Sequence, residues 1–167
     1  MNRLAAMRRP WFKCQSVEEA FFDTAPLRLQ AEFDITQPAT QVWADLTAEH
    51  PLAWCRILQD VTWTSPRPFG VDTTRTARAL GGTNVLKERF FRWEEGRRHS
   101  FVVLQASTPM FRRFAEDYLV EPTSENSCRF AWTIAIEPRR AARIANPANR
   151  LLLETLFRDT RKYYGLR

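Results

Sequence analysis

The 167-residue chain is poor in the residues that usually carry metal, disulfide or phosphate chemistry. Its two histidines, His50 and His99, and its three widely separated cysteines form none of the HxH, HExxH or CxxC spacings that bind zinc. An odd number of separated cysteines also favours free thiols in a reducing compartment over a disulfide framework. Gly81 and Gly82 are followed by no Lys-Ser or Lys-Thr, so they predict a hairpin turn rather than a phosphate loop. We expect no metal and no cofactor.

Long apolar runs are also missing. The longest ones fall short of the ~18 residues that a membrane helix needs. The arginines among the first ten residues are not followed by the ~7–15 apolar residues of a secretory signal. We therefore expect a cytoplasmic protein without an integral membrane segment. The 44% hydrophobic and 26% charged residues are ordinary for a globular protein of about one domain.

Lysine is scarce: the net charge is +6, yet only three of the 25 Lys and Arg residues are Lys. The arginines are spread along the chain and interleaved with Asp and Glu. This pattern is typical of a solvated, arginine-rich outer face, so we expect no dedicated nucleic-acid site.

Two parts of the chain differ in pattern. Residues 1–26 form an irregular lead-in whose aromatic side chains (Trp11, Phe12, Phe21 and Phe22) predict docking on the domain. Within it, Ser16 and Glu19 have the spacing of a capping box that would start a short helix. Residues 27–167 are expected to form one domain.

Periodicity and turn signals predict an α+β architecture for that domain. A strictly alternating strand at 27–35 is followed by two short helices, at 38–46 and at 50–57. A meander of six strands comes next, at 58–65, 73–80, 84–93, 98–106, 112–121 and 128–137, each bounded by a turn signal. A short helical piece at 139–145 and a long amphipathic helix at 147–164 complete the domain. Gly165 is expected to end the long helix.

This order, together with four local strings, resembles the START/Bet v 1-like (SRPBCC) superfamily and, within it, the polyketide cyclase/dehydrase-like group. The strings are AEFDITQPATQVWADL (31–46), FGVDTTRTARAL (69–80), NVLKERFFRWEEGRRHSFVV (84–103) and FAEDYLVEP with CRFAWTIAIEP (114–138). The resemblance implies a helix-grip fold, in which a curved antiparallel sheet of about seven strands wraps around a long C-terminal helix. A deep cavity is expected between the sheet and that helix. Relatives often carry Gly where this chain has Asp72, so the turn there is expected to differ. The group has no universal catalytic motif.

Register arguments predict which side chains face the helix. A turn at Glu95-Gly96 pairs Glu88 with Val103, Phe90 with Phe101 and Arg92 with His99. Leu86 and Gln105 join the same inner face, while Phe91 and Trp93 point outward unless a bulge intervenes. In the last hairpin Tyr118 is paired with Trp132 and Glu116 with Ile134. The inner residues there are Phe114, Glu116, Tyr118, Val120, Phe130, Trp132, Ile134 and Ile136.

The predicted inner surface is apolar with a few polar groups, which is typical of a pocket for a small hydrophobic ligand. The candidate ligand-binding residues are Phe90, Phe101, Val103, Phe114, Tyr118, Trp132, Ile134, Leu153 and Phe157. The candidate acid–base residues are Glu88, Glu116, Tyr118 and His99, with Gln105 as a further polar group. The two glutamates could instead pair with inward arginines such as Arg92 or Arg56, because a buried carboxylate must be paired or neutral.

Three functions remain open at this point. The first is binding of a polyketide-, lipid- or aromatic-like molecule between sheet and helix. The second is a cofactor-independent polyketide cyclase, aromatase or dehydratase that uses the same pocket, which proximity of both glutamates to Tyr118 would favour. The third is lipid or quinone transfer or a protein-interaction module, which a small or filled cavity would favour.

Overall fold

The computed structural model describes residues 9–140, 142 and 146–166. One antiparallel sheet dominates it, with the strand order β2-β8-β7-β6-β5-β4-β3 and with β1 paired to β6. The strands are β1 Phe12–Lys13, β2 Leu27–Ile35, β3 Leu58–Trp63, β4 Thr74–Ala79, β5 Asn84–Glu94, β6 Arg98–Ala106, β7 Phe111–Ser124 and β8 Ser127–Pro138. The helices are α1 Phe21–Thr24, α2 Ala39–Leu46 and α3 Asn146–Tyr163.

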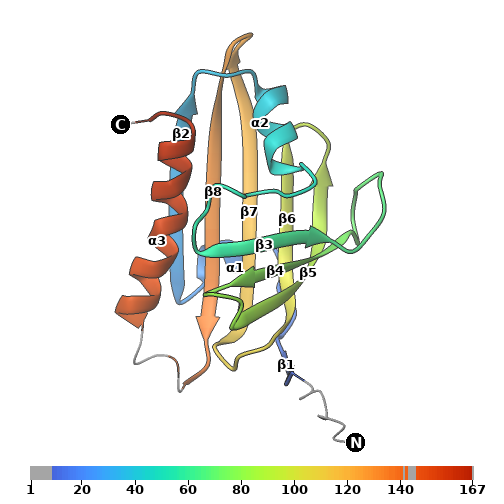
Figure 1. The fold of residues 1–167 in the computed structure, drawn as a ribbon, viewed down its shortest axis with the longest axis vertical. Coiled ribbons are helices and arrows are strands. Elements are labelled where there is room, and N and C mark those ends of the chain that lie inside the picture. The colour runs from blue at the N-terminus through green and yellow to red at the C-terminus, as the bar shows by residue number, and fades with distance from the viewer. Residues whose placement is uncertain (1–8, 141, 143–145, 167) are drawn as a thin grey trace, which may run out of the picture.

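The sheet curls, so that β3, β4 and β5 cross in front of the long strands β7 and β8, with α3 lying beside β2 (Figure 1). Helix α3 has a one-sided apolar stripe, of which Leu156, Phe157 and Thr160 are buried. Phe157 packs edge-on against Trp132 of β8, with ring centroids 5.4 Å apart. Because both partners lose their contact with water, this packing holds the helix on the concave face. The predicted helix-grip architecture is confirmed.

Two positions with left-handed backbone define chain reversals near this core. Gly165 has a φ of +69°, and the Leu166 N–H then donates to the Arg161 carbonyl at 2.8 Å, which ends α3. Asp72, in the turn before β4, has a φ of 67°. Asp tolerates this region better than most residues, so the turn before β4 forms without glycine.

The convex face of the sheet carries its own small cluster. Phe21 and Phe22 of α1 pack there with Phe91, Ala115 and Ala135. Phe91 stacks on Phe22 with ring centroids 6.2 Å apart. The outward Phe91 is therefore covered by the residues that precede β2.

Residues 50–57 form turns, and the short helix predicted there is wrong. Leu52 adopts a φ of 60°, which a continuous right-handed helix excludes. Leu52 and Cys55 are nevertheless buried, and the Trp54 indole N–H donates to the Thr160 hydroxyl of α3 at 3.0 Å. The segment thus satisfies its apolar pattern by packing on α3 rather than by forming a helix. Of the helical piece predicted at 139–145, residues 141 and 143–145 lie outside the described residues.

The hairpin of β5 and β6 has two irregularities that change the predicted facing. The register shifts between Phe90 and Arg92, so Trp93 rather than Arg92 is opposite His99. Arg92 is paired with Ser100 instead, and its guanidinium reaches Glu19 on the convex side. The inward placement of Arg92 was therefore wrong, because a bulge reverses the alternation of side chains. A second shift pairs Gln105 with Lys87, so the inward placement of Gln105 was also wrong.

Within the described residues, no helix combines the length and the apolar character needed to cross a membrane. Across the same residues, no three His, Cys, Asp or Glu side chains come together as a group that could hold a metal ion.

Candidate functional site

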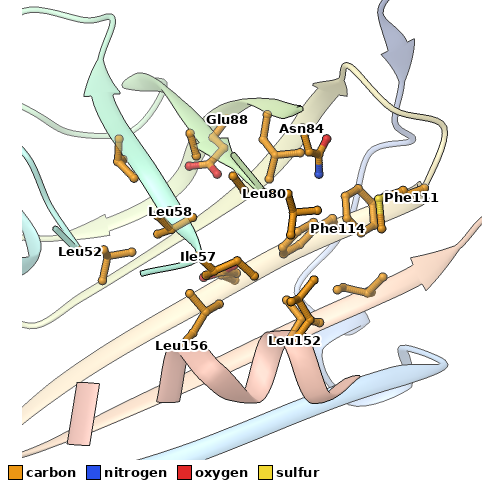
Figure 2. Close-up of a pocket in the computed structure, with 18 of the residues that line it drawn as sticks. Leu52, Ile57, Leu58, Leu80, Asn84, Glu88, Phe111, Phe114, Leu152 and Leu156 are labelled. Carbon is orange, nitrogen blue, oxygen red and sulfur yellow. The ribbon is translucent and has the colours of Figure 1, made fainter. Parts of the chain in front are cut away.

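A cavity of about 90 Å³ lies between the sheet and the N-terminal half of α3. Figure 2 shows Leu152 and Leu156 rising from α3 toward Leu58 of β3 and Phe114 of β7. Most of the surrounding side chains are aliphatic or aromatic, and they come from β2, the turn before β3, the strands β3 to β8 and α3. The cavity is therefore an apolar space whose wall combines segments from both halves of the chain.

The packing of α3 changes along its length at this cavity. Leu156 and Phe157 are buried, whereas Leu153 is half-buried and Leu151 is 66% exposed. The N-terminal half of α3 thus covers the cavity with less buried apolar surface than the C-terminal half.

A buried ion pair forms one polar part of the wall. The Nε–H of Arg75 in β4 donates to Oε2 of Glu88 in β5 at 2.5 Å, and the two side chains are 1% and 4% exposed. Burial lowers the pKa of Arg75, but the charge and hydrogen bond of Glu88 together with the nearby Tyr118 and Glu116 outweigh burial, and the pKa is raised overall. The guanidinium therefore stays charged. The sequence-based choice of Arg92 or Arg56 as the partner was wrong, since Arg56 bonds Asp159 of α3.

Glu116 of β7 forms the second polar part of the wall. Its Oε2 accepts hydrogen bonds from the Tyr118 hydroxyl at 2.9 Å and from the Trp132 indole N–H at 2.8 Å. Burial, followed by the negative charge of Glu88, raises the pKa of Glu116 to about 7, against the two hydrogen bonds and Arg75. This carboxyl group can therefore both give and take a proton near neutral pH.

His99 of β6 lies behind the cavity and not in its wall. It is fully buried among the rings of Trp43, Phe90, Trp93 and Tyr118, at centroid distances of 4.7–5.3 Å. Neither ring nitrogen has a hydrogen-bond partner within the described residues. Burial, with the nearby charge of Arg75, lowers the pKa of His99 well below its ordinary value, so the ring stays neutral.

The predicted site residues divide into two groups. Those that border the cavity are Glu88, Phe101, Phe114, Glu116, Tyr118, Trp132 and Leu153. Those that lie in the surrounding core are Phe90, His99, Val103, Ile134 and Phe157. All were expected on the inner face, but being on that face does not bring a side chain to the cavity, because neighbouring rings fill the space in front of it.

Arg75 is the main polar residue that the sequence analysis missed. A signal for it existed, because Arg75, Ala77 and Ala79 alternate with Thr74, Thr76 and Arg78 along β4. Two small apolar residues two and four positions after Arg75 place it on the buried face. By contrast, no local pattern indicates that Leu52 and Ile57, in the turn segment, reach the same cavity.

Comparisons with known proteins agree with this fold. Residues 26–165 match the family described as polyketide cyclase / dehydrase and lipid transport. An uncharacterised protein of Mycobacterium tuberculosis is 35% identical over 163 residues, which cover 93% of this chain and 95% of that protein, and a Mycobacterium bovis protein matches equally.

Three solved structures show the same fold at low sequence identity. A START superfamily protein from Mycobacterium smegmatis has a TM-score of 0.64 at 10% identity, over 83% of this chain and 97% of that one. A major latex-like protein from Panax ginseng has a TM-score of 0.60 at 15% identity, over 83% of this chain and 97% of that one. The Zhui aromatase/cyclase of a Streptomyces species has a TM-score of 0.61 at 14% identity, over 82% of this chain and 95% of that one.

The curved sheet closed by one long helix over an apolar cavity is a START-like, helix-grip fold. The chain belongs to the polyketide cyclase / dehydrase and lipid transport family, whose model covers residues 26–165.

Proposed function

We propose that the protein binds a small, mainly apolar molecule in the cavity beneath the N-terminal half of α3. The observation that carries this proposal is the wall itself, which is apolar except for the Arg75–Glu88 pair and the group around Glu116. An apolar space with a few fixed polar groups is the usual chemistry of a small-molecule site.

The size of the cavity restricts how such a ligand fits. A volume of about 90 Å³ is below the roughly 150 Å³ of an engineered cavity that holds benzene in another protein. By this comparison even a ligand of one ring must displace the N-terminal half of α3. A small cavity is also the mark of an interaction module. Ligand binding is favoured here because the Arg75–Glu88 pair and Glu116 border an otherwise apolar space, which gives a bound molecule fixed polar groups to contact.

A pair of variants on one helix tests the proposal. Leu153→Trp puts a bulky ring into the cavity wall, whereas Leu151→Trp adds the same ring at a position that is 66% exposed and does not border the cavity. The probe is the neutral fluorophore N-phenyl-1-naphthylamine, with thermal melts to confirm folding. We expect binding by the wild type and by Leu151→Trp, and loss of binding in Leu153→Trp. Equal binding by both variants, or none by the wild type, would overturn the proposal.

A second candidate function is acid–base catalysis in the same cavity, of the cyclase, aromatase or dehydratase type. The observation that favours it is Glu116, whose pKa of about 7 suits proton transfer at neutral pH and which contacts the Tyr118 hydroxyl. The test is turnover of a short poly-ketone by the wild type and by Glu116→Gln. Loss of turnover with unchanged binding of the fluorophore would support catalysis, and unchanged turnover would exclude a role for Glu116.

A further inference from the structure

A cluster of cations lies at the end of the molecule where β8 ends and α3 begins. In Figure 1 these two chain ends and β1 share the lower end of the molecule. The cations, which we call the basic patch, are Lys13, Lys87, Arg112, Arg139 and Arg140. All of them except Lys87 line one open groove of about 430 Å³.

Strand register extends the basic patch across one face of the sheet. Lys13 of β1 is paired with Gln105 of β6, and Gln105 is paired with Lys87 of β5. Directly paired side chains point to the same face, so the two lysines lie on one side of the sheet. On its other side β1 reaches β7, where the Gln15 N–H donates to the Arg112 carbonyl at 2.8 Å. From β5 to the end of β8 the patch is therefore roughly 19 Å wide at ~4.8 Å per strand, which is wider than a site for one small anion.

Few carboxylates balance the basic patch. Within the described residues, Arg112 alone among its cations forms a salt bridge, to Glu137, and that carboxylate is shared with Arg113. The segments that supply β1 and the connection from β8 to α3 also lack acidic residues, because none precedes Glu18 and none lies between Glu137 and Glu154. The excess positive charge is thus available to an anionic partner.

Two arginines of the basic patch are held in place by the protein itself. Arg139 donates through Nε to the Phe111 carbonyl at 3.0 Å and through Nη2 to the Lys13 carbonyl at 2.6 Å. Arg112 donates through Nε to the side-chain oxygen of Gln15 at 3.1 Å. A guanidinium has five N–H donors, so both arginines keep donors for a further acceptor. A guanidinium that is already fixed loses little conformational entropy when it meets an anion.

Exposed apolar side chains at the same end indicate which anionic partner fits. Trp11 is 38% exposed and packs against Lys87, whose Nζ lies 4.0 Å from the ring centroid. Leu151, in the first turns of α3, is 66% exposed. Cations beside exposed Trp and Leu side chains are typical of surfaces that lie among the headgroups of a membrane. A nucleic acid offers no hydrocarbon to such side chains.

We propose that this end of the protein binds to membranes that contain anionic phospholipids, through the basic patch and Trp11. The inference goes beyond the proposed ligand binding, because it assigns a partner to a surface outside the cavity. Phe111 and Pro138 border the cavity, and each is followed directly by an arginine of the patch. Binding in this orientation holds that end of the cavity near the bilayer.

Co-sedimentation with phosphatidylcholine vesicles, with and without phosphatidylglycerol, tests the proposal. The variant is Lys13→Gln/Arg140→Gln, because both side chains are exposed. The matched control is Arg28→Gln/Arg158→Gln, which removes the same charge from a second groove, between β2 and α3. Thermal melts confirm that both double variants fold. Duplex DNA and polyglutamate are the alternative anionic partners.

We expect the wild type to bind only the vesicles that contain phosphatidylglycerol. Binding should weaken as NaCl rises from ~10 to ~150 mM, because the Debye length falls from about 30 to about 8 Å. Each cation near an anionic membrane strengthens binding about fivefold, so Lys13→Gln/Arg140→Gln should bind roughly tenfold or more weakly. The control should keep the wild-type affinity to within about threefold, since its charges lie away from the bilayer.

A second measurement reports contact with the hydrocarbon itself. Brominated acyl chains in the vesicles should quench the fluorescence of the wild type more than that of Trp11→Phe. Equal quenching of both proteins, equal weakening in the two double variants, or equal binding to both kinds of vesicle would overturn the proposal. Tighter binding of DNA or polyglutamate than of the vesicles would also overturn it. Binding of the naphthylamine fluorophore without vesicles should be the same in both double variants, so failure of this proposal is distinguishable from failure of ligand binding.

Discussion

Glu116→Gln should change how the stability of the protein depends on pH. Glutamine keeps an oxygen that can accept the Tyr118 and Trp132 hydrogen bonds, but it cannot ionise. The folded protein raises the pKa of Glu116 from 4.5 to about 7, chiefly by burial. Because the folded state holds the proton more tightly than the unfolded chain, the resulting stability is fully present below about pH 4.5 and is lost as pH rises through 7.

The size of the effect follows from this shift. Each pKa unit corresponds to about 1.4 kcal/mol, so a rise from 4.5 to about 7 is worth about 3 kcal/mol. The free energy of unfolding of Glu116→Gln, relative to that of the wild type, should therefore increase by about 3 kcal/mol between pH 4.5 and pH 8.5. Any constant cost of burying the amide cancels in this difference.

Urea unfolding, followed by the fluorescence of the six tryptophans, measures both proteins across this pH range. Glu125→Gln, in the exposed turn between β7 and β8, is the control for removal of a surface carboxylate, and it should change stability by less than ~0.5 kcal/mol. If the stability difference between Glu116→Gln and the wild type is the same at pH 4.5 and at pH 8.5, the description of Glu116 as a buried, proton-holding carboxyl group is refuted.

Three further predictions concern the neighbouring charges and the surface. Arg75→Met should lower the free energy of unfolding by about 3–5 kcal/mol because Glu88 loses its buried partner. Arg75→Met/Glu88→Met should recover most of that loss, because no lone buried charge remains. Urea unfolding of both variants measures this, and a single variant as stable as the wild type would contradict it. His99→Leu should stabilise the protein by about 1–2 kcal/mol at pH 7, because two unpartnered ring nitrogens are removed. The variant should also lose less stability than the wild type below about pH 6.5, because there only the unfolded chain readily protonates His99. The same dependence of melting temperature on pH in the variant and in the wild type would count against this prediction. Finally, duplex DNA should bind no tighter than ~10⁻⁶ M at physiological salt, because arginines such as Arg97, Arg98 and Arg129 are paired with carboxylates; a submicromolar, salt-dependent isotherm would argue otherwise.

Local patterns predicted the α+β class and most of the strands, and the family resemblance implied the helix-grip fold. The alternation at 27–35 predicts β2 to the residue, because one buried face forces every second side chain to be apolar. The same argument predicts the pairing of Tyr118 with Trp132 and of Glu116 with Ile134. The apolar stripe of α3 likewise predicts which side of the helix meets the sheet.

The details of the cavity wall were harder to predict because they depend on irregular backbone. A bulge between Phe90 and Arg92 sends Arg92 to the convex face and Trp93 to the core. The sequence of β5 itself does not mark the position of this bulge. The left-handed backbone at Leu52 replaces a helix that the apolar pattern also allows. Sequence periodicity is the same for both outcomes, so only the packing energy of the whole molecule chooses between them.

By itself, the sequence determined the order of β2 to β8 and α3, the apolar faces of the sheet and of α3, and the inward position of Glu88 and Glu116. These features follow from residue type and spacing along one element. The tertiary structure alone decided that Glu88 pairs with Arg75, that Glu116 meets Tyr118 and Trp132 with a pKa near 7, and that His99 lies outside the cavity wall. Those outcomes depend on distances of a few ångströms between separate strands and on how far water is excluded from them, and both exist only once the sheet has curled around the helix.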